Sequence, residues 1–156
     1  LVEMGVPPFL VAFTANIIVA QRLVRKICEY CKKEYRLEKP AIAELEKAFD
    51  TKKMLSLFEG QNIKLKTEEK NLETIIFYRG AGCSRCGTSG YKGRIGIYEV
   101  LEVDKELVAK INARATADDI KAHATTNGMI TMLQDGLLKA KLGVTTIEEV
   151  LRATRD

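Results

Sequence analysis

The chain has 156 residues, of which 46% are hydrophobic and 6% aromatic, and its net charge is +4 at pH 7. This composition predicts one folded domain, or a domain with a small appendage, and it excludes a chain that is disordered throughout. The mild positive charge permits an anionic partner without requiring one.

The N-terminal segment is apolar, but it lacks the pattern of a signal peptide. Its longest apolar run, "FLVAFTANIIVA" at residues 9–20, is shorter than the ~20 residues that a membrane span needs. The start at Leu1 is consistent with a piece of a longer protein. We predict a helix over about residues 8–15 and a strand over residues 17–27, with one continuous helix as the alternative.

Four cysteines form two C-x-x-C pairs, Cys28 with Cys31 in "CEYC" and Cys83 with Cys86 in "CSRC". Two such pairs supply the four thiolates of a tetrahedral zinc site, and with four ligands the site is closed and structural. Gly87 follows the second pair, where the backbone often needs a positive φ. We predict zinc, with nearby Lys32, Lys33 and Arg85 offsetting the thiolate charge.

Several alternatives to zinc remain open at this point. The number of residues between Cys31 and Cys83 is 51, more than the ~15–20 of a compact zinc ribbon. A pair of disulfides, a redox dithiol and another soft metal are the competing interpretations. A phosphate-binding loop is disfavoured, because "GTSGYKGR" lacks the G-x-x-x-x-G-K-[ST] pattern.

The segment between the cysteine pairs changes in composition. Helices are predicted within "EKPAIAELEKAFD" and "TKKMLSLFEG", followed by a charged surface loop, "QNIKLKTEEKNLE" at residues 61–73. Two strands, "TIIFYR" at residues 74–79 and "RIGIYEVL" at residues 94–101, flank the second cysteine pair. We therefore expect a small, mostly helical insertion between the two pairs.

Four short amphipathic helices follow, within residues 104–113, 116–128, 131–143 and 145–154. Their starts show cap-like pairs, Thr116 with Asp119, Thr131 with Gln134 and Thr145 with Glu148. We expect one compact helical bundle. His123 has no cluster of partner ligands, so we interpret it as a packed or solvated helical residue.

Three stretches together resemble one family: "MGVPPFLVAFTANIIVAQRLVRKICEYCK", "GCSRCGTSGYKGRIGIYEVL" and "GMITMLQDGLLKAKLGVTTIEEVLRAT". In this order they are similar to the C-terminal part of the type II secretion and type IV pilus assembly ATPases. The resemblance implies an α+β fold: the end of a RecA-like α/β ATPase domain with an inserted tetracysteine zinc subdomain and a C-terminal helical bundle. The implied segments are 1–27 and 87–103 for the ATPase core, 28–86 for the zinc subdomain and 104–156 for the bundle.

The resemblance also implies a function and partners. Family members are cytoplasmic homo-hexamers that bind ATP and magnesium and work with inner-membrane components of the secretion or pilus machine. The Walker A motif, acidic boxes and His box of the family lie upstream of the matching residues, and none is present here. We therefore expect that this chain alone does not hydrolyse ATP and offers no catalytic or nucleotide-binding residue.

Two other functions stay as alternatives. A zinc-ribbon nucleic-acid binder is suggested by "QRLVRK" beside "CKK", although few aromatic residues other than Tyr30 and Tyr35 lie near the cysteines. Because of that scarcity we expect no nucleic acid. A redox protein is the other alternative. Arg22, Arg25 and Arg94 are candidates for contacts with nucleotide or a neighbouring subunit, but roles on a strand surface or in salt bridges are favoured.

Overall fold

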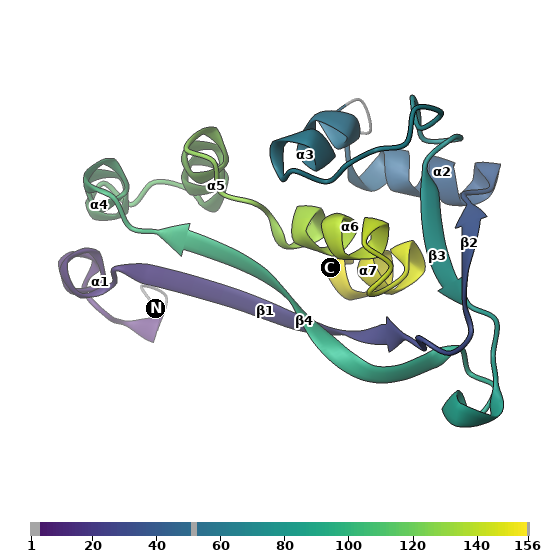
Figure 1. Ribbon diagram of the computed structural model, residues 1–156. Helices are drawn as coiled ribbons and strands as arrows, with labels where there is room; N and C mark the ends of the chain where they lie inside the picture. Colours follow the sequence, from purple (N-terminus) through teal and green to yellow (C-terminus); the bar gives the residue numbers. More distant parts are fainter. Residues whose placement is uncertain (1–3, 51–52, 156) are drawn as a thin grey trace. The chain divides into compact units, whose positions relative to one another are not determined.

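The computed structural model describes residues 4–50 and 53–155 and shows helices mixed with two-stranded sheets, in agreement with the predicted α+β class (Figure 1). The N-terminal half contains the helix α1, the strands β1 and β2 and the helices α2 and α3. The second half contains β3, the short 3-10 helix η3, β4 and four further helices. Their bounds are, in chain order: α1 Pro8–Thr14, β1 Ile17–Ile27, β2 Lys32–Arg36, α2 Lys39–Ala48, α3 Met54–Gly60, β3 Ile76–Gly80, η3 Ser84–Cys86, β4 Tyr91–Glu102, α4 Lys105–Asn112, α5 Ala117–Thr126, α6 Met132–Lys141 and α7 Ile147–Thr154.

The chain divides into two compact units. The first comprises Leu1–Gln21 and Tyr98–Met132, and the second comprises Arg22–Ile97 and Leu133–Asp156. β1 and β4 pair in a two-stranded sheet, and each strand contributes residues to both units. The four C-terminal helices, which we expected in one bundle, are divided between the units, with α4 and α5 in the first and almost all of α6 and all of α7 in the second.

In the first unit, helix α4 packs against α1 and α5. Asp104 caps α4, because its carboxylate accepts a hydrogen bond from the backbone N–H of Leu107 at 2.7 Å. The same carboxylate lies 2.9 Å from Nε2 of His123 on α5. His123 is therefore a packed helical residue, as predicted. Thr116 and Asp119 form the predicted capping box at the start of α5.

The second unit contains an antiparallel pair of strands, β2 and β3, in which Lys32 lies opposite Gly80 and Arg36 opposite Ile76. Helices α2 and α7 contact each other in this unit. Its core is built of large apolar side chains that are fully buried: Leu45, Met54, Phe58, Ile75, Phe77, Leu137, Ile147 and Val150. This core positions the loop that holds the second cysteine pair.

The structure confirms most of the predicted elements and corrects several details. β1 spans the predicted residues 17–27 as a strand, so the continuous helix is wrong. β3 starts at Ile76, two residues later than predicted, and β4 starts at Tyr91, three residues earlier. The charged segment 61–73 is not all surface, because the carboxylate of Glu69 is buried in an ion pair with Lys141.

The predicted cap of the last helix is wrong by one residue. α7 is capped by Thr146, whose hydroxyl accepts from the N–H of Glu149, and not by Thr145 with Glu148. The reason is that the hydroxyl of Thr145 donates to the carbonyl of Arg25 at 2.8 Å. Two consecutive Thr–Glu pairs fit the capping pattern, and tertiary contacts select the second. Among the described residues, every helix is too short or too polar to cross a membrane.

Candidate metal centre

Two segments far apart in the chain bring the four cysteines together. Cys28 follows β1 and Cys31 precedes β2, whereas Cys83 directly precedes η3 and Cys86 is its last residue, between β3 and β4. The four sulfur atoms all lie within 4.8 Å of one another. Cys28 and Cys31 are buried, and the other two are half-buried. This cluster could therefore hold a metal ion through four sulfur ligands.

The sulfur–sulfur distances exclude disulfide bonds in this structure. The Sγ atoms of Cys28 and Cys83 are 3.9 Å apart, as are those of Cys31 and Cys86, and those of Cys83 and Cys86 are 3.7 Å apart. A disulfide needs a sulfur–sulfur distance of about 2.05 Å. All four cysteines are thus free thiols, so the two predicted pairs converge on one point without being oxidised.

Glycine lets the backbone close around the second pair. A Cβ atom on Gly80 would lie 2.0 Å from the carbonyl oxygen of Gly90, and one on Gly90 would lie 2.6 Å from that of Gly80. The N–H of Cys28 donates to the carbonyl of Gly90 at 2.9 Å, so this close approach also anchors the first pair. The glycine-rich composition around the cysteines therefore serves backbone packing.

The turn after Cys86 has the left-handed backbone that the sequence predicts. Gly87 has φ of 58° and closes η3, with its N–H donating to the carbonyl of Ser84. Thr88 also has a positive φ, 62°, which the sequence did not indicate because a β-branched residue rarely adopts it. The N–H of Thr88 donates to the carbonyl of Cys83 at 2.9 Å, so the strained residue helps to close the loop around the thiols.

The thiols differ in acidity. Burial, together with the neighbouring thiols, raises the pKa of Cys31 to about 12. Burial also favours the neutral form of Cys86, but hydrogen bonds from the backbone of Cys83 and Gly90 outweigh it and lower the pKa of Cys86 to about 6. The N–H of Cys83 lies 3.2 Å from Sγ of Cys86. The backbone of this loop is thus arranged to stabilise a thiolate.

Two of the cations expected to offset the thiolates, Arg85 and Lys32, contact aromatic rings. The guanidinium of Arg85 lies 3.8 Å from the centre of the Tyr30 ring. The ammonium of Lys32 lies 5.4 Å from the centre of the Tyr78 ring and donates to the carbonyl of Gly143 at 3.4 Å. The contacts with the Tyr30 and Tyr78 rings are cation–π interactions, which the sequence did not predict.

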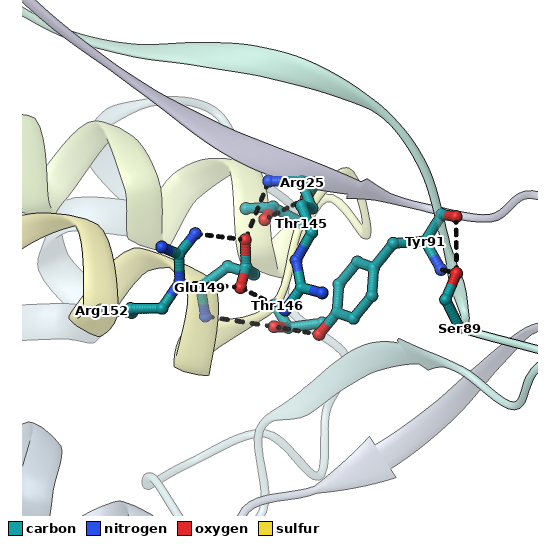
Figure 2. Close-up of polar contacts among 7 residues, drawn as sticks. All are labelled: Arg25, Ser89, Tyr91, Thr145, Thr146, Glu149 and Arg152. Carbon is teal, nitrogen blue, oxygen red and sulfur yellow. Dashed lines mark hydrogen bonds and ion pairs between the residues drawn. The ribbon is translucent and has the colours of Figure 1, made fainter.

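A second polar cluster joins the end of β1 to helix α7, and Figure 2 shows its side chains. Its centre is Glu149, whose side chain is only 2% exposed. The carboxylate accepts from the backbone N–H and Nη2 of Arg25, at 3.0 and 2.7 Å, and from Nε and Nη2 of Arg152, at 3.1 and 2.9 Å. Arg25 also stacks on Tyr91, with 4.1 Å between the guanidinium and the ring centre.

The burial of Glu149 could not be predicted from the sequence. An acidic pair in the first turn of a helix, as at residues 148 and 149, is explained by the helix dipole without any burial. Burial by itself raises the pKa of Glu149, but hydrogen bonds from the two guanidinium groups and from the N–H of Arg25 outweigh it and lower the pKa to about 2. Glu149 is therefore ionised at neutral pH and holds both arginines.

The three arginines singled out from the sequence have different surroundings. Arg25 forms a salt bridge, as favoured above. Arg22 donates to the backbone carbonyls of Ala153 and Arg155, so it binds the last turn of α7. Arg94 is exposed on β4. A contact with nucleotide or with a neighbouring subunit was the less favoured alternative for these arginines, and it stays untested.

Comparison with known proteins identifies the family. The model of the type II/IV secretion system protein family matches residues 1–152, so the chain belongs to that family, as the resemblance indicated. A type IV pilus assembly ATPase, PilB, of Thermus thermophilus is 40% identical over 97% of the chain. PilB of Pseudomonas aeruginosa is 36% identical over 100% of the chain, and the type II secretion system ATPase E of Vibrio cholerae is 37% identical over 99%.

The chain is short compared with these relatives. It covers 15% of the Thermus protein, 24% of the Pseudomonas protein and 26% of the Vibrio protein. The activity of the complete relatives can therefore be assigned to this chain only as a proposal.

Proposed function

We propose that the chain is the C-terminal part of a cytoplasmic hexameric ATPase that powers type II protein secretion or type IV pilus assembly, and that its four cysteines hold a structural zinc ion. The family match and the names of the relatives support the first half of this proposal. The second half rests on one observation: four sulfur atoms from two distant segments lie within 4.8 Å of one another.

The four thiols fit zinc in number, chemistry and spacing. Zn–S bonds are about 2.3 Å long, so the sulfur atoms of a tetrahedral site lie roughly 3.8 Å apart. The distances of 3.7 and 3.9 Å between three pairs of sulfur atoms agree with this value. When bound, zinc supplies a four-way link between the two segments and no catalysis, since four thiolates fill all of its positions.

The residues of this chain prepare the site in two ways. The backbone of residues 83 and 90 stabilises a thiolate at Cys86, which is the protonation state that binds a metal. The close contact between Gly80 and Gly90 closes the loop of the second pair, and backbone hydrogen bonds from Cys28 to Gly90 and from Ala81 to Cys31 join it to the first pair. On this proposal, residues 28–86 form the zinc subdomain, residues 1–27 and 87–103 belong to the ATPase core and residues 104–156 are the C-terminal helical part.

The rest of the proposal concerns the complete protein. ATP and magnesium would bind to parts of the relatives that have no counterpart among these residues, so we propose that the chain alone does not hydrolyse ATP. Its partners would be neighbouring ATPase subunits and inner-membrane components of the machine. Nucleic acid is not proposed as a partner, and the contact between Arg85 and Tyr30 supports this choice because it covers one face of a ring that bases would otherwise stack on.

The test of this proposal measures metal and turnover on the same preparation. We expect one zinc ion per purified chain by elemental analysis, and no hydrolysis of magnesium–ATP above a buffer blank. A chain with free thiols and no bound metal after purification in zinc-containing medium contradicts the zinc site. ATP turnover that persists through further purification contradicts the proposal that ATP is hydrolysed only by other parts of the complete protein. Tight, strongly salt-dependent retardation of DNA or RNA favours the zinc-ribbon alternative.

A further inference from the structure

The two edges of the β2–β3 pair differ. On β3, the backbone N–H of Ile76 donates to the carboxylate of Glu69 at 2.7 Å, and the carbonyl of Ile76 accepts from Nζ of Lys141 at 3.1 Å. Glu69 and Lys141 form a buried ion pair. This pair therefore takes the place of a further strand on the outer edge of β3, and that edge is occupied.

The edge of β2 is open. In an antiparallel pair, residues that lie opposite each other exchange two hydrogen bonds or none. Because the N–H and C=O of Ile76 point away from β2, those of its opposite residue Arg36 point away from β3. The same holds for Glu34 and Lys32, at two-residue steps along the strand. Within residues 4–50 and 53–155, these outward backbone groups have no hydrogen-bond partner.

The side chains at this edge are mostly basic and exposed. β2 has the sequence "KKEYR", and its only acidic residue, Glu34, is in an ion pair with Lys66 at 3.5 Å. Lys33 lies directly opposite Arg79 of β3, so two like charges face each other across the ladder. Such a pair is unfavourable without an anion nearby, and in the described part of the chain Lys33, Arg36 and Arg79 have no ion-pair partner.

We propose that the open edge of β2 binds an extended, acidic segment of a partner protein, which adds a strand to the β2–β3 pair. An incoming strand would satisfy the outward N–H and C=O groups, and carboxylates on one face of it would neutralise Lys33 and Arg79, which lie on the same face of the β2–β3 pair. This inference goes beyond the proposed zinc and ATPase roles and does not depend on either.

Charge and hydrogen bonding favour an acidic strand over a second copy of the chain, a lipid surface or a nucleic acid as the partner of this edge. A second copy of the chain is disfavoured, because pairing β2 with β2 would bring two sets of lysine and arginine side chains together. A lipid surface or a nucleic acid would neutralise the charges but offers no row of backbone groups at strand spacing. The ring of Tyr35 already lies beneath Arg79, at 5.1 Å from its guanidinium, which leaves one face fewer for a base.

The experiment uses the whole chain and a fluorescent peptide, Thr-Glu-Val-Glu-Val-Glu-Thr, followed by anisotropy at about 150 mM salt. We expect saturable binding that is lost when the glutamates are replaced by glutamine and when the central residues are N-methylated. N-methylation removes the backbone donors but leaves the charge. Equal binding of the N-methylated peptide, or no binding of the unmodified one, overturns strand addition.

Variants of the chain separate the two contributions. Glu34→Pro removes an outward N–H that makes no bond to β3, and a proline is tolerated at such a position of an edge strand. Its matched control, Glu34→Ala, loses the same carboxylate but keeps the N–H. We expect binding to be roughly tenfold weaker for the proline variant than for the alanine variant. Equal affinities for the two variants overturn the proposal.

The charge is tested with Lys33→Glu, for which we expect binding to be weakened by roughly tenfold or more. The control is Lys121→Glu, an equal change of charge at an exposed residue of α5. Equal losses for the two variants would mean that only net charge matters, which overturns a site on β2. Binding to phosphatidylglycerol vesicles that is stronger than to the peptide and insensitive to Glu34→Pro also overturns it, in favour of a lipid surface.

Discussion

The cysteine cluster and the Glu149 cluster lie at the same end of β1. The first can be predicted from the sequence, whereas the second cannot. Cys28 and Cys83 are 55 residues apart in the chain, and Arg25 and Glu149 are 124 apart. Both clusters therefore depend on long-range folding. Cysteine pairs at C-x-x-C spacing have few other uses, whereas arginine and glutamate are abundant on protein surfaces. A rare residue type reveals a distant contact in advance, and a common one does not.

The two clusters also hold the chain by different forces. The thiols have no strong attraction for one another, so on the zinc proposal their link depends on a metal that a chelator removes. The Glu149 carboxylate holds its two arginines by charge-assisted hydrogen bonds, so this link depends on pH. Variants that disable each cluster separately test whether the two links stabilise the fold in these different ways.

The largest effect is expected from removing a cysteine. Cys83→Ser, or treatment of the wild-type chain with a strong chelator, should abolish zinc binding and lower Tm steeply, because structural zinc sites contribute on the order of 10 kcal/mol to folding. Thermal unfolding followed by circular dichroism, with zinc measured in parallel, provides the readout. Ser84→Ala, in the same 3-10 helix, is the control and should keep its zinc. A wild-type Tm that does not respond to the chelator would contradict the metal role.

The next largest effect is expected from Glu149→Gln. Breaking a buried ion pair costs about 3–5 kcal/mol, and here we expect about 2–4 kcal/mol, because Arg25 and Arg152 are 50% and 62% exposed and regain water. Urea unfolding measures the change in the free energy of unfolding. Glu148→Gln removes the same charge from the exposed neighbour and should cost less than about 1 kcal/mol. Similar losses in both variants would show that the Glu149 cluster adds little.

These two clusters show how far the sequence could predict the molecule. The bounds of β1 and the convergence of the four cysteines followed from local patterns. The burial of Glu149 and Glu69 did not follow from such patterns. Each carboxylate is neutralised by a cation far away in the chain, Arg25 for Glu149 and Lys141 for Glu69. A local pattern records the face of a helix or the charge of a loop, but it does not record which distant residue will meet it.

The pH dependence of stability should separate the two clusters further. The pKa of Glu149 is lowered from 4.5 to about 2, so its contribution is fully present above the unfolded value and is lost as the pH falls through the folded value. Between pH 4.5 and about 2 the wild type should lose up to about 3 kcal/mol more than Glu149→Gln. The difference between the two titration curves isolates Glu149 from other carboxylates, including Asp104, whose pKa is also lowered. Parallel curves would contradict the assignment.

The smallest effect concerns the cap of α7, where the sequence offered two equivalent threonines. Thr146→Ala removes the hydroxyl that accepts from the N–H of Glu149 and contacts the Tyr91 hydroxyl at 3.1 Å, and it should cost about 1 kcal/mol. Thr146→Ser keeps the hydroxyl and should restore most of this loss in urea unfolding. Thr145 is no cap, so Thr145→Ser, which keeps the bond to the Arg25 carbonyl, should differ from the wild type only by the buried methyl group. If Thr146→Ala and Thr146→Ser were equally destabilised, packing of the methyl group and not capping would explain why helix α7 begins where it does.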